Sequence, residues 1–238
     1  MYQQQRIDYF KALQILKGFV KDEKTIAHSH AVYFAAMDDA VKSRVTGVYC
    51  DPEEVAIGGL LHDIGKEWRI EKNPKKGMIL DSPINITNLN KKIKRIVSDP
   101  TTIGLYDEPD IHPIISGEIL QALRLPQYAD MARTHGFAEE VRKIYGINGD
   151  FLPRSIEQKI VANADFRVIN TNFTSVDQRI SCLEKRYQER KSWEKLENLQ
   201  NAIPRMKALE EELMRLWSKN YYLRMYVDDV REFVENQE

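Results

Sequence analysis

The chain has 238 residues, 42% of them hydrophobic and 30% charged, which is typical of a globular protein and excludes a disordered one. Its formal net charge of −1 gives no overall field that would draw it to nucleic acid or to a membrane surface. No signal-peptide pattern, no apolar run of roughly 20 residues and no metal-type or disulfide spacing of Cys50 and Cys182 is present. We therefore expect a cytoplasmic protein without membrane spans.

Helical periodicity predicts three helices in the first third of the chain. The first is marked by apolar residues at helical spacing, namely Ile7, Phe10, Leu13, Leu16 and Val20. A second, largely apolar helix is expected from about Lys24 to Val41. A third begins where Asp51 can cap, Pro52 fits the first turn and Glu54 suits a capping box, and Gly65 offers its stop.

The periodicity weakens over residues 67–110, which we interpret as an irregular insertion with one short helix at 91–97. Between Lys66 and Arg95 there are nine Lys or Arg residues against three acidic ones. This basic excess is either a solvated surface or an electropositive rim for an anionic substrate, and the sequence leaves both interpretations open.

Helical patterns resume after His112 and continue to the end of the chain. From Ser175 onward there are 12 Lys or Arg residues against 13 acidic ones, and Pro204 is expected to separate or kink two long helices. An apolar stripe, formed by Leu209, Leu213, Leu216 and Trp217, indicates core packing or a partner surface. We predict an all-α fold with a metal-binding domain at residues 1–174, a helical extension at 175–238 packed on it, and a possible homo-oligomer through the C-terminal helices.

The pair His62-Asp63 stands at the end of an apolar helix, where a buried carboxylate needs a partner. A metal ion would satisfy it directly, because neutral imidazole and carboxylate are good ligands. For the dipeptide alone, an aspartate bonded to the backbone at a helix end is the simpler explanation. The surrounding residues change that balance.

The segment Gly58-Gly59-Leu60-Leu61-His62-Asp63-Ile64-Gly65-Lys66 closely resembles the signature of the HD superfamily, helical metal-dependent phosphohydrolases. Ala27-His28-Ser29-His30-Ala31-Val32 is similar to the family's first-ligand helix, and Ala162-Asn163-Ala164-Asp165 to its last. The resemblance covers about residues 24–190. It implies an HD-domain helical bundle in which His28, His62, Asp63 and Asp165 bind metal, while His30 supports the ligands from behind or serves packing.

Two further histidines fit the six-ligand version of this family, which binds two metals. His112 precedes Pro113 at the start of a helix, and His135 precedes Gly136, a plausible helix stop. For either residue alone, an ordinary surface or core histidine would be the better explanation. The family pattern favours a binuclear site of Fe, Mn, Ni, Co or Zn, bridged by Asp63.

The resemblance also suggests roles around the metals. Lys66 would contact the substrate phosphate or the attacking water, and Arg133 and Arg167 are weaker candidates for binding substrate anions. Asp63 and Lys66 are thus the expected catalytic residues of a hydrolase that cleaves a phosphate ester, with a nucleotide as the default substrate. A small phosphorylated molecule is the expected partner, and the sequence shows no clear nucleic-acid site.

Two alternatives remain from the same residues. A minority of HD proteins, resembling inositol oxygenase, use a di-iron site with this ligand order to activate oxygen. A non-catalytic HD module that binds a nucleotide or a partner is a third possibility. Cyclic-di-GMP phosphodiesterases are set aside, because their Gly-Tyr-Pro motif is absent from the sequence.

Overall fold

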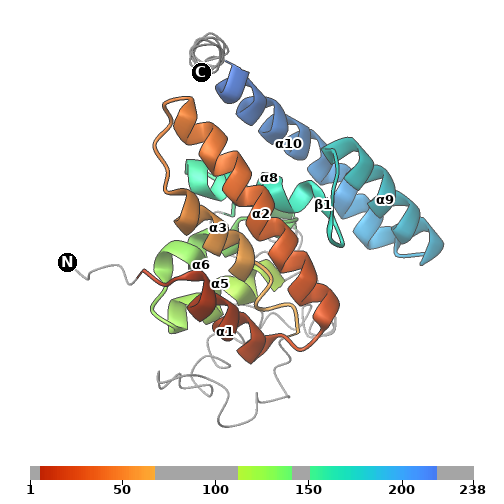
Figure 1. The fold of residues 1–238 in the computed structure, drawn as a ribbon. Coiled ribbons are helices and arrows are strands. Elements are labelled where there is room, and N and C mark those ends of the chain that lie inside the picture. The colour runs from red at the N-terminus through yellow and green to blue at the C-terminus, as the bar shows by residue number, and fades with distance from the viewer. Residues whose placement is uncertain (1–5, 68–111, 141–150, 219–238) are drawn as a thin grey trace, which may run out of the picture.

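The computed structural model describes residues 6–67, 112–140 and 151–218 (Figure 1). The helices are α1 (Tyr9–Phe19), α2 (Glu23–Val45), α3 (Pro52–Leu61), α5 (His112–Ala122), α6 (Pro126–Arg133), α8 (Ile156–Phe166), α9 (Val176–Glu189) and α10 (Trp193–Ser218). A two-residue hairpin, β1 (Val168–Ile169) with β2 (Asn172–Phe173), joins α8 to α9. The predicted all-α class is confirmed. The expected short helix at 91–97 lies outside the described residues, as does nearly all of the expected insertion.

Aspartate and serine side chains cap the helix starts. Asp51 accepts hydrogen bonds from the backbone N–H groups of Glu53 and Glu54, as its position before Pro52 predicted. The expected end of this helix at Gly65 is wrong, because α3 ends at Leu61 and a turn of residues 62–67 follows. His62 and Asp63 therefore belong to a turn and not to a helix.

Helix α3 lies at the centre of the molecule, between two apolar clusters (Figure 1). All of its residues from Val55 to Leu61 are buried. Ile57, Leu60 and Leu61 pack with α1, α5 and α6, while Val55 packs with α2, α8, α9 and α10. The turn after α3 is thereby fixed in the interior, which is where the candidate site lies.

The C-terminal helices α9 and α10 share an apolar cluster with α2 and α8. Leu209 and Leu213 of the predicted stripe are buried in this cluster, so the stripe packs within the chain. The expected separation at Pro204 is wrong, since α10 continues through it. Buried Ala202 and Met206 on either side offset the missing backbone hydrogen bond. The domain boundary at residue 174 stays a prediction.

Over the described ranges, no helix combines the length and the apolar character that crossing a membrane would require.

Candidate metal centre

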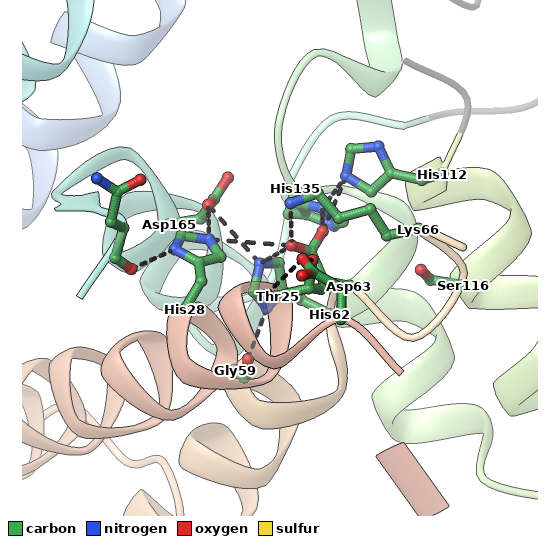
Figure 2. Close-up of polar contacts among 12 residues, drawn as sticks. Thr25, His28, Gly59, His62, Asp63, Lys66, His112, Ser116, His135 and Asp165 are labelled. Carbon is green, nitrogen blue, oxygen red and sulfur yellow. Dashed lines mark hydrogen bonds and ion pairs between the residues drawn. The ribbon is translucent and has the colours of Figure 1, made fainter. Parts of the chain in front are cut away.

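Six residues from distant parts of the chain meet in the interior (Figure 2). They come from α2, the turn after α3, the start of α5, the turn after α6 and the last turn of α8: His28, His62, Asp63, His112, His135 and Asp165. They form three overlapping groups whose ligand atoms lie within 4.8 Å of one another: His28 with His62 and Asp63, His62 with His135 and Asp165, and Asp63 with His112 and His135.

Glycine allows the turn that carries His62 and Asp63 to approach α5. A Cβ added at Gly65 would lie 2.6 Å from the backbone nitrogen of Ser116, too close for any other residue. The Gly65 N–H also donates to Ser116 Oγ at 2.9 Å. The expected helix-stop glycine is thus a close-approach glycine, and it brings Asp63 next to His112.

Backbone carbonyls fix the tautomers of three histidines. His28 Nδ1 lies 3.0 Å from the carbonyl oxygen of Asn170, His62 Nδ1 2.6 Å from that of Gly59, and His135 Nδ1 2.5 Å from that of Ala132. A carbonyl only accepts, so each Nδ1 carries a proton, and a ring protonated at Nδ1 alone presents its Nε2 lone pair to the centre. Metal-binding histidines are typically oriented in this way.

The carbonyl that orients His28 comes from an unusual backbone position. Asn170 stands at the tip of the β1–β2 hairpin with a φ of 56°, in the left-handed region that asparagine tolerates better than most residues. The small hairpin after α8 therefore has a clear role, because it holds the ring of His28 in one tautomer.

The lone pairs of the cluster point at negatively charged oxygens. His62 Nε2 is buried without a hydrogen-bond partner and lies 3.5 Å from Asp63 Oδ2 and 3.7 Å from Asp165 Oδ1. His28 Nε2 lies 3.1 Å from Asp165 Oδ1. A lone pair facing a carboxylate is repulsive, and a cation between them makes the contact favourable. The residues therefore fit a bound metal ion.

Burial and charge set the protonation states that a metal ligand needs. Burial lowers the pKa of His62, which keeps its ring neutral. Burial alone would raise the pKa of Asp63 and of Asp165. Lys66 and neighbouring histidines instead hold the pKa of Asp63 well below its usual range, and the adjacent His28 and His62 rings do the same for Asp165. Both carboxylates are therefore ionised.

Lys66 lies beside the cluster, with Nζ 2.6 Å from Asp63 Oδ2. Burial alone would lower the pKa of Lys66, but the Asp63 carboxylate raises it, so the side chain is charged. Lys66 also lines the cavity above the cluster, within reach of a bound molecule.

This cavity has a volume of about 320 Å³ and opens over His28, Asp63, His112 and Asp165. Its other wall comes from α9 and the residues that follow: Arg179, Leu183, Arg186, Tyr187, Arg190, Ser192 and Lys195. Sequence reasoning missed this wall, although the spacing of the arginines along one helix face could have indicated it. The cavity thus has candidate ligand residues at its floor and cationic side chains at its side.

The other predicted contacts lie elsewhere. Arg133 pairs with Glu118 at 2.9 Å and with Asp130 at 3.0 Å, and Arg167 pairs with Asp39 at 3.0 Å. Neither arginine lines the cavity over the cluster, so the structure does not bring these two expected substrate-binding residues to the site. His30 Nδ1 instead lies 3.1 Å from the Tyr9 hydroxyl, in a packing position.

No protein-family model and no solved structure matches the chain. A tRNA (cytidine(56)-2'-O)-methyltransferase of Picrophilus torridus is 31% identical over 216 residues, which are 90% of this chain and 48% of that protein. An uncharacterized protein of Methanocaldococcus jannaschii is 29% identical over 185 residues, which are 76% of the chain and 86% of that protein. The chain therefore spans about half the length of the methyltransferase.

The methyltransferase relative corrects the expected function. A nucleotide phosphohydrolase was predicted, with the corresponding hydrolase class, but the activity named for the methyltransferase is methyl transfer to a tRNA cytidine. The prediction came from the resemblance of several motifs to the HD superfamily, with the His-Asp pair at their centre. Such a signature describes a metal site, and one metal site can serve several chemistries.

Proposed function

We propose that this chain is a metal-binding helical domain that binds tRNA and serves its 2'-O-methylation. One observation carries the proposal: buried imidazole lone pairs converge with two ionised carboxylates at the floor of a cavity that has cationic walls. The similarity to a tRNA methyltransferase is the reason for proposing tRNA as the substrate, and the residues of the site are the reason for proposing a metal.

The arrangement around Asp63 favours two metal ions. Its Oδ1 lies 3.0 Å from His112 Nε2 and 3.6 Å from His135 Nε2, while its Oδ2 lies 3.5 Å from His62 Nε2 and 3.9 Å from His28 Nε2. A carboxylate whose two oxygens face separate pairs of imidazoles is suited to bridge two ions. The mixed ligands favour Fe, Mn, Ni, Co or Zn over Mg.

The chemistry required by a ribose hydroxyl matches what such a site offers. Bound divalent ions lower the pKa of a coordinated water or hydroxyl and neutralise phosphate oxygens. Lys66 adds a cation beside Asp63, and the α9 side of the cavity adds three arginines. These residues would hold the phosphates next to the acceptor ribose. Its 2'-hydroxyl would give its proton to solvent, and the 2'-oxygen would attack the methyl carbon of S-adenosylmethionine, whose carbon–sulfur bond would break to release S-adenosylhomocysteine.

The test uses the full chain loaded with Mn²⁺, after which metal content, affinity for tRNA and incorporation of labelled methyl groups from S-adenosylmethionine are measured. We expect tRNA binding that weakens on chelation and returns on reloading, with methyl incorporation following the same pattern. The His62→Ala variant, which loses a buried ligand, should behave as the chelated protein does. The proposal would be overturned if tRNA bound equally well with and without the metal, or if the metal-loaded chain had no affinity for tRNA.

A further inference from the structure

A row of arginines runs along the face of α9 that borders the cavity. Arg179, Arg186 and Arg190 follow one another at intervals of seven and four residues, which places them on one helix face. At a rise of 1.5 Å per residue, the row from Arg179 to Arg190 is about 16 Å long. We call these three residues the arginine row.

The members of the arginine row lack acidic partners among the described residues, unlike Arg133, Arg167 and Arg205. Arg133, Arg167 and Arg205 each pair with a carboxylate, at 2.9, 3.0 and 2.8 Å. Within the ranges that the structure describes, no ion pair joins a member of the row to an acidic residue, and Arg179 Nε is buried without a hydrogen-bond partner. Aligned cations of this kind favour an anionic ligand from outside the chain.

Three aromatic rings line the same cavity. Phe137 stacks on Phe166 with ring centroids 6.3 Å apart, and Tyr187 lies one residue after Arg186 on α9. Bases of single-stranded nucleic acid stack on such rings while arginines follow the backbone. The cavity thus combines the two kinds of contact that a nucleic-acid strand uses.

We propose that the arginine row binds phosphates spaced along a single-stranded RNA segment, and that this directs one of its riboses to the His and Asp cluster. The inference rests on the proposed function for the identity of the RNA, and on the row itself for the mode of binding. It goes beyond the sequence-based expectation, which found no clear nucleic-acid site.

The dimensions favour a strand over a mononucleotide. Successive phosphates of a stacked strand are about 3.4 Å apart along the axis, so a row of about 16 Å spans several nucleotides. The cavity, at about 320 Å³, has room for one nucleotide at the metal cluster but not for a double helix. A single-stranded loop or end of a tRNA meets both requirements.

The experiment measures binding of fluorescent RNA oligonucleotides of one to seven nucleotides to the metal-loaded chain, over a range of salt concentrations. The variant combines Arg179→Gln, Arg186→Gln and Arg190→Gln. A matched control combines Lys185→Gln, Lys207→Gln and Arg215→Gln, which removes the same charge from exposed positions outside the cavity. Metal content and circular dichroism are recorded for both.

Wild-type affinity should rise with oligonucleotide length to about five nucleotides, the number of phosphates that the row spans. The row variant should bind roughly 10- to 100-fold more weakly, and the slope of log K against log salt should fall in magnitude by about 2, as the loss of three phosphate contacts implies. The control should keep the wild-type slope. If the triple variant fails to fold, Arg190→Gln alone, at an exposed position, should reduce the slope by about 0.7.

Each result decides between the two proposals. An unchanged slope in a folded row variant with normal metal content would overturn the row and leave the metal-binding function standing. A mononucleotide that binds as tightly as a longer oligonucleotide would also overturn it, because the site would then be a nucleotide pocket. Loss of slope in a chain that binds no metal would keep the row and overturn the proposed function.

Discussion

Helix α8 lines two cavities, and the charged groups in them are arranged differently. One cavity, of about 660 Å³, is lined by Asn163 and Arg167 together with residues of α2 and α10. Behind it, Asn163 Nδ2 and Arg167 Nη1 both donate to Asp39, at 3.1 and 3.0 Å. The other cavity, of about 320 Å³, is lined by Asp165 and lies over the cluster of candidate metal ligands.

The contrast shows how to separate a structural network from a ligand site. Around Asp39, Asn163 Nδ2 and Arg167 both donate to the carboxylate, so its charge is neutralised within the chain, although Asn163 Oδ1 is buried without a partner. Around Asp165, by contrast, the lone pairs of His28 and His62 face a carboxylate, an arrangement that needs something from outside the chain. The larger cavity is therefore the weaker candidate for a ligand site, because the volume of a cavity does not show whether the charged groups around it lack partners.

The largest expected effect is that of Asp63→Asn. We expect metal content to fall from about two ions per chain to near zero, because the bridging charge between the two imidazole pairs is lost. Elemental analysis after reconstitution measures it. Asp39→Asn is the matched control, an equally buried carboxylate in the same interior, and it should retain the metal. If Asp63→Asn kept its full metal content, the residues around Asp63 would not differ from those around Asp39 in binding metal.

The second prediction concerns the loss of one metal ion per chain instead of two. A variant combining His112→Ala and His135→Ala removes the pair that faces Asp63 Oδ1, while His28, His62 and Asp165 remain. Metal content should fall from about two to about one, as expected if each oxygen of Asp63 serves its own ion. His30→Ala, which removes a histidine outside the cluster, should change nothing. One ion in the wild type, unaffected by the double change, would make the site mononuclear.

The third prediction concerns the stability that the ion pair between Asp39 and Arg167 provides. Asp39→Asn leaves Arg167 without its partner, and we expect the free energy of unfolding to fall by about 2 kcal/mol, less than for a fully buried pair. The Arg167 side chain is 25% exposed, so water compensates part of the loss. Denaturant unfolding measures the change. Metal loss in this variant that exceeded its loss of stability would show that the two sides of α8 are not independent.

Proline and glycine residues that mark helix ends in the sequence indicated where much of the candidate site lies. Pro113 after His112 and Gly136 after His135 indicated helix ends, and the structure has both histidines there, beside the turn that carries His62. Helix ends carry side chains into interiors because their backbone leaves regular geometry. The all-α class followed from helical periodicity in the same way, and the ligand roles of these residues stay predictions.

The errors in prediction came from partners that are distant in sequence. Arg167 was expected at the substrate, but its partner Asp39 is 128 positions away and no local pattern shows it. Arg133 packs across Gly117, where a Cβ would lie 2.5 Å from its Cγ, to reach Glu118. The arginine row was missed for the opposite reason. Its pattern is local, but its meaning depends on which cavity the α9 face borders.

The smallest expected effect concerns Lys66. This residue could serve the cluster, because it pairs with Asp63, or a bound ligand, because it also lines the cavity. If its main role is to neutralise Asp63, Lys66→Ala should change metal affinity, since the ions would take over that charge. If it contacts the RNA backbone, the variant should keep its metal and lose one phosphate contact, which lowers the salt slope of RNA binding by about 0.7. We expect the second result, because bound ions would neutralise Asp63 without help from Lys66. Lys185→Ala, at an exposed position outside the cavity, is the control. A Lys66→Ala variant with lower metal content and an unchanged slope would assign the lysine to the metal cluster alone.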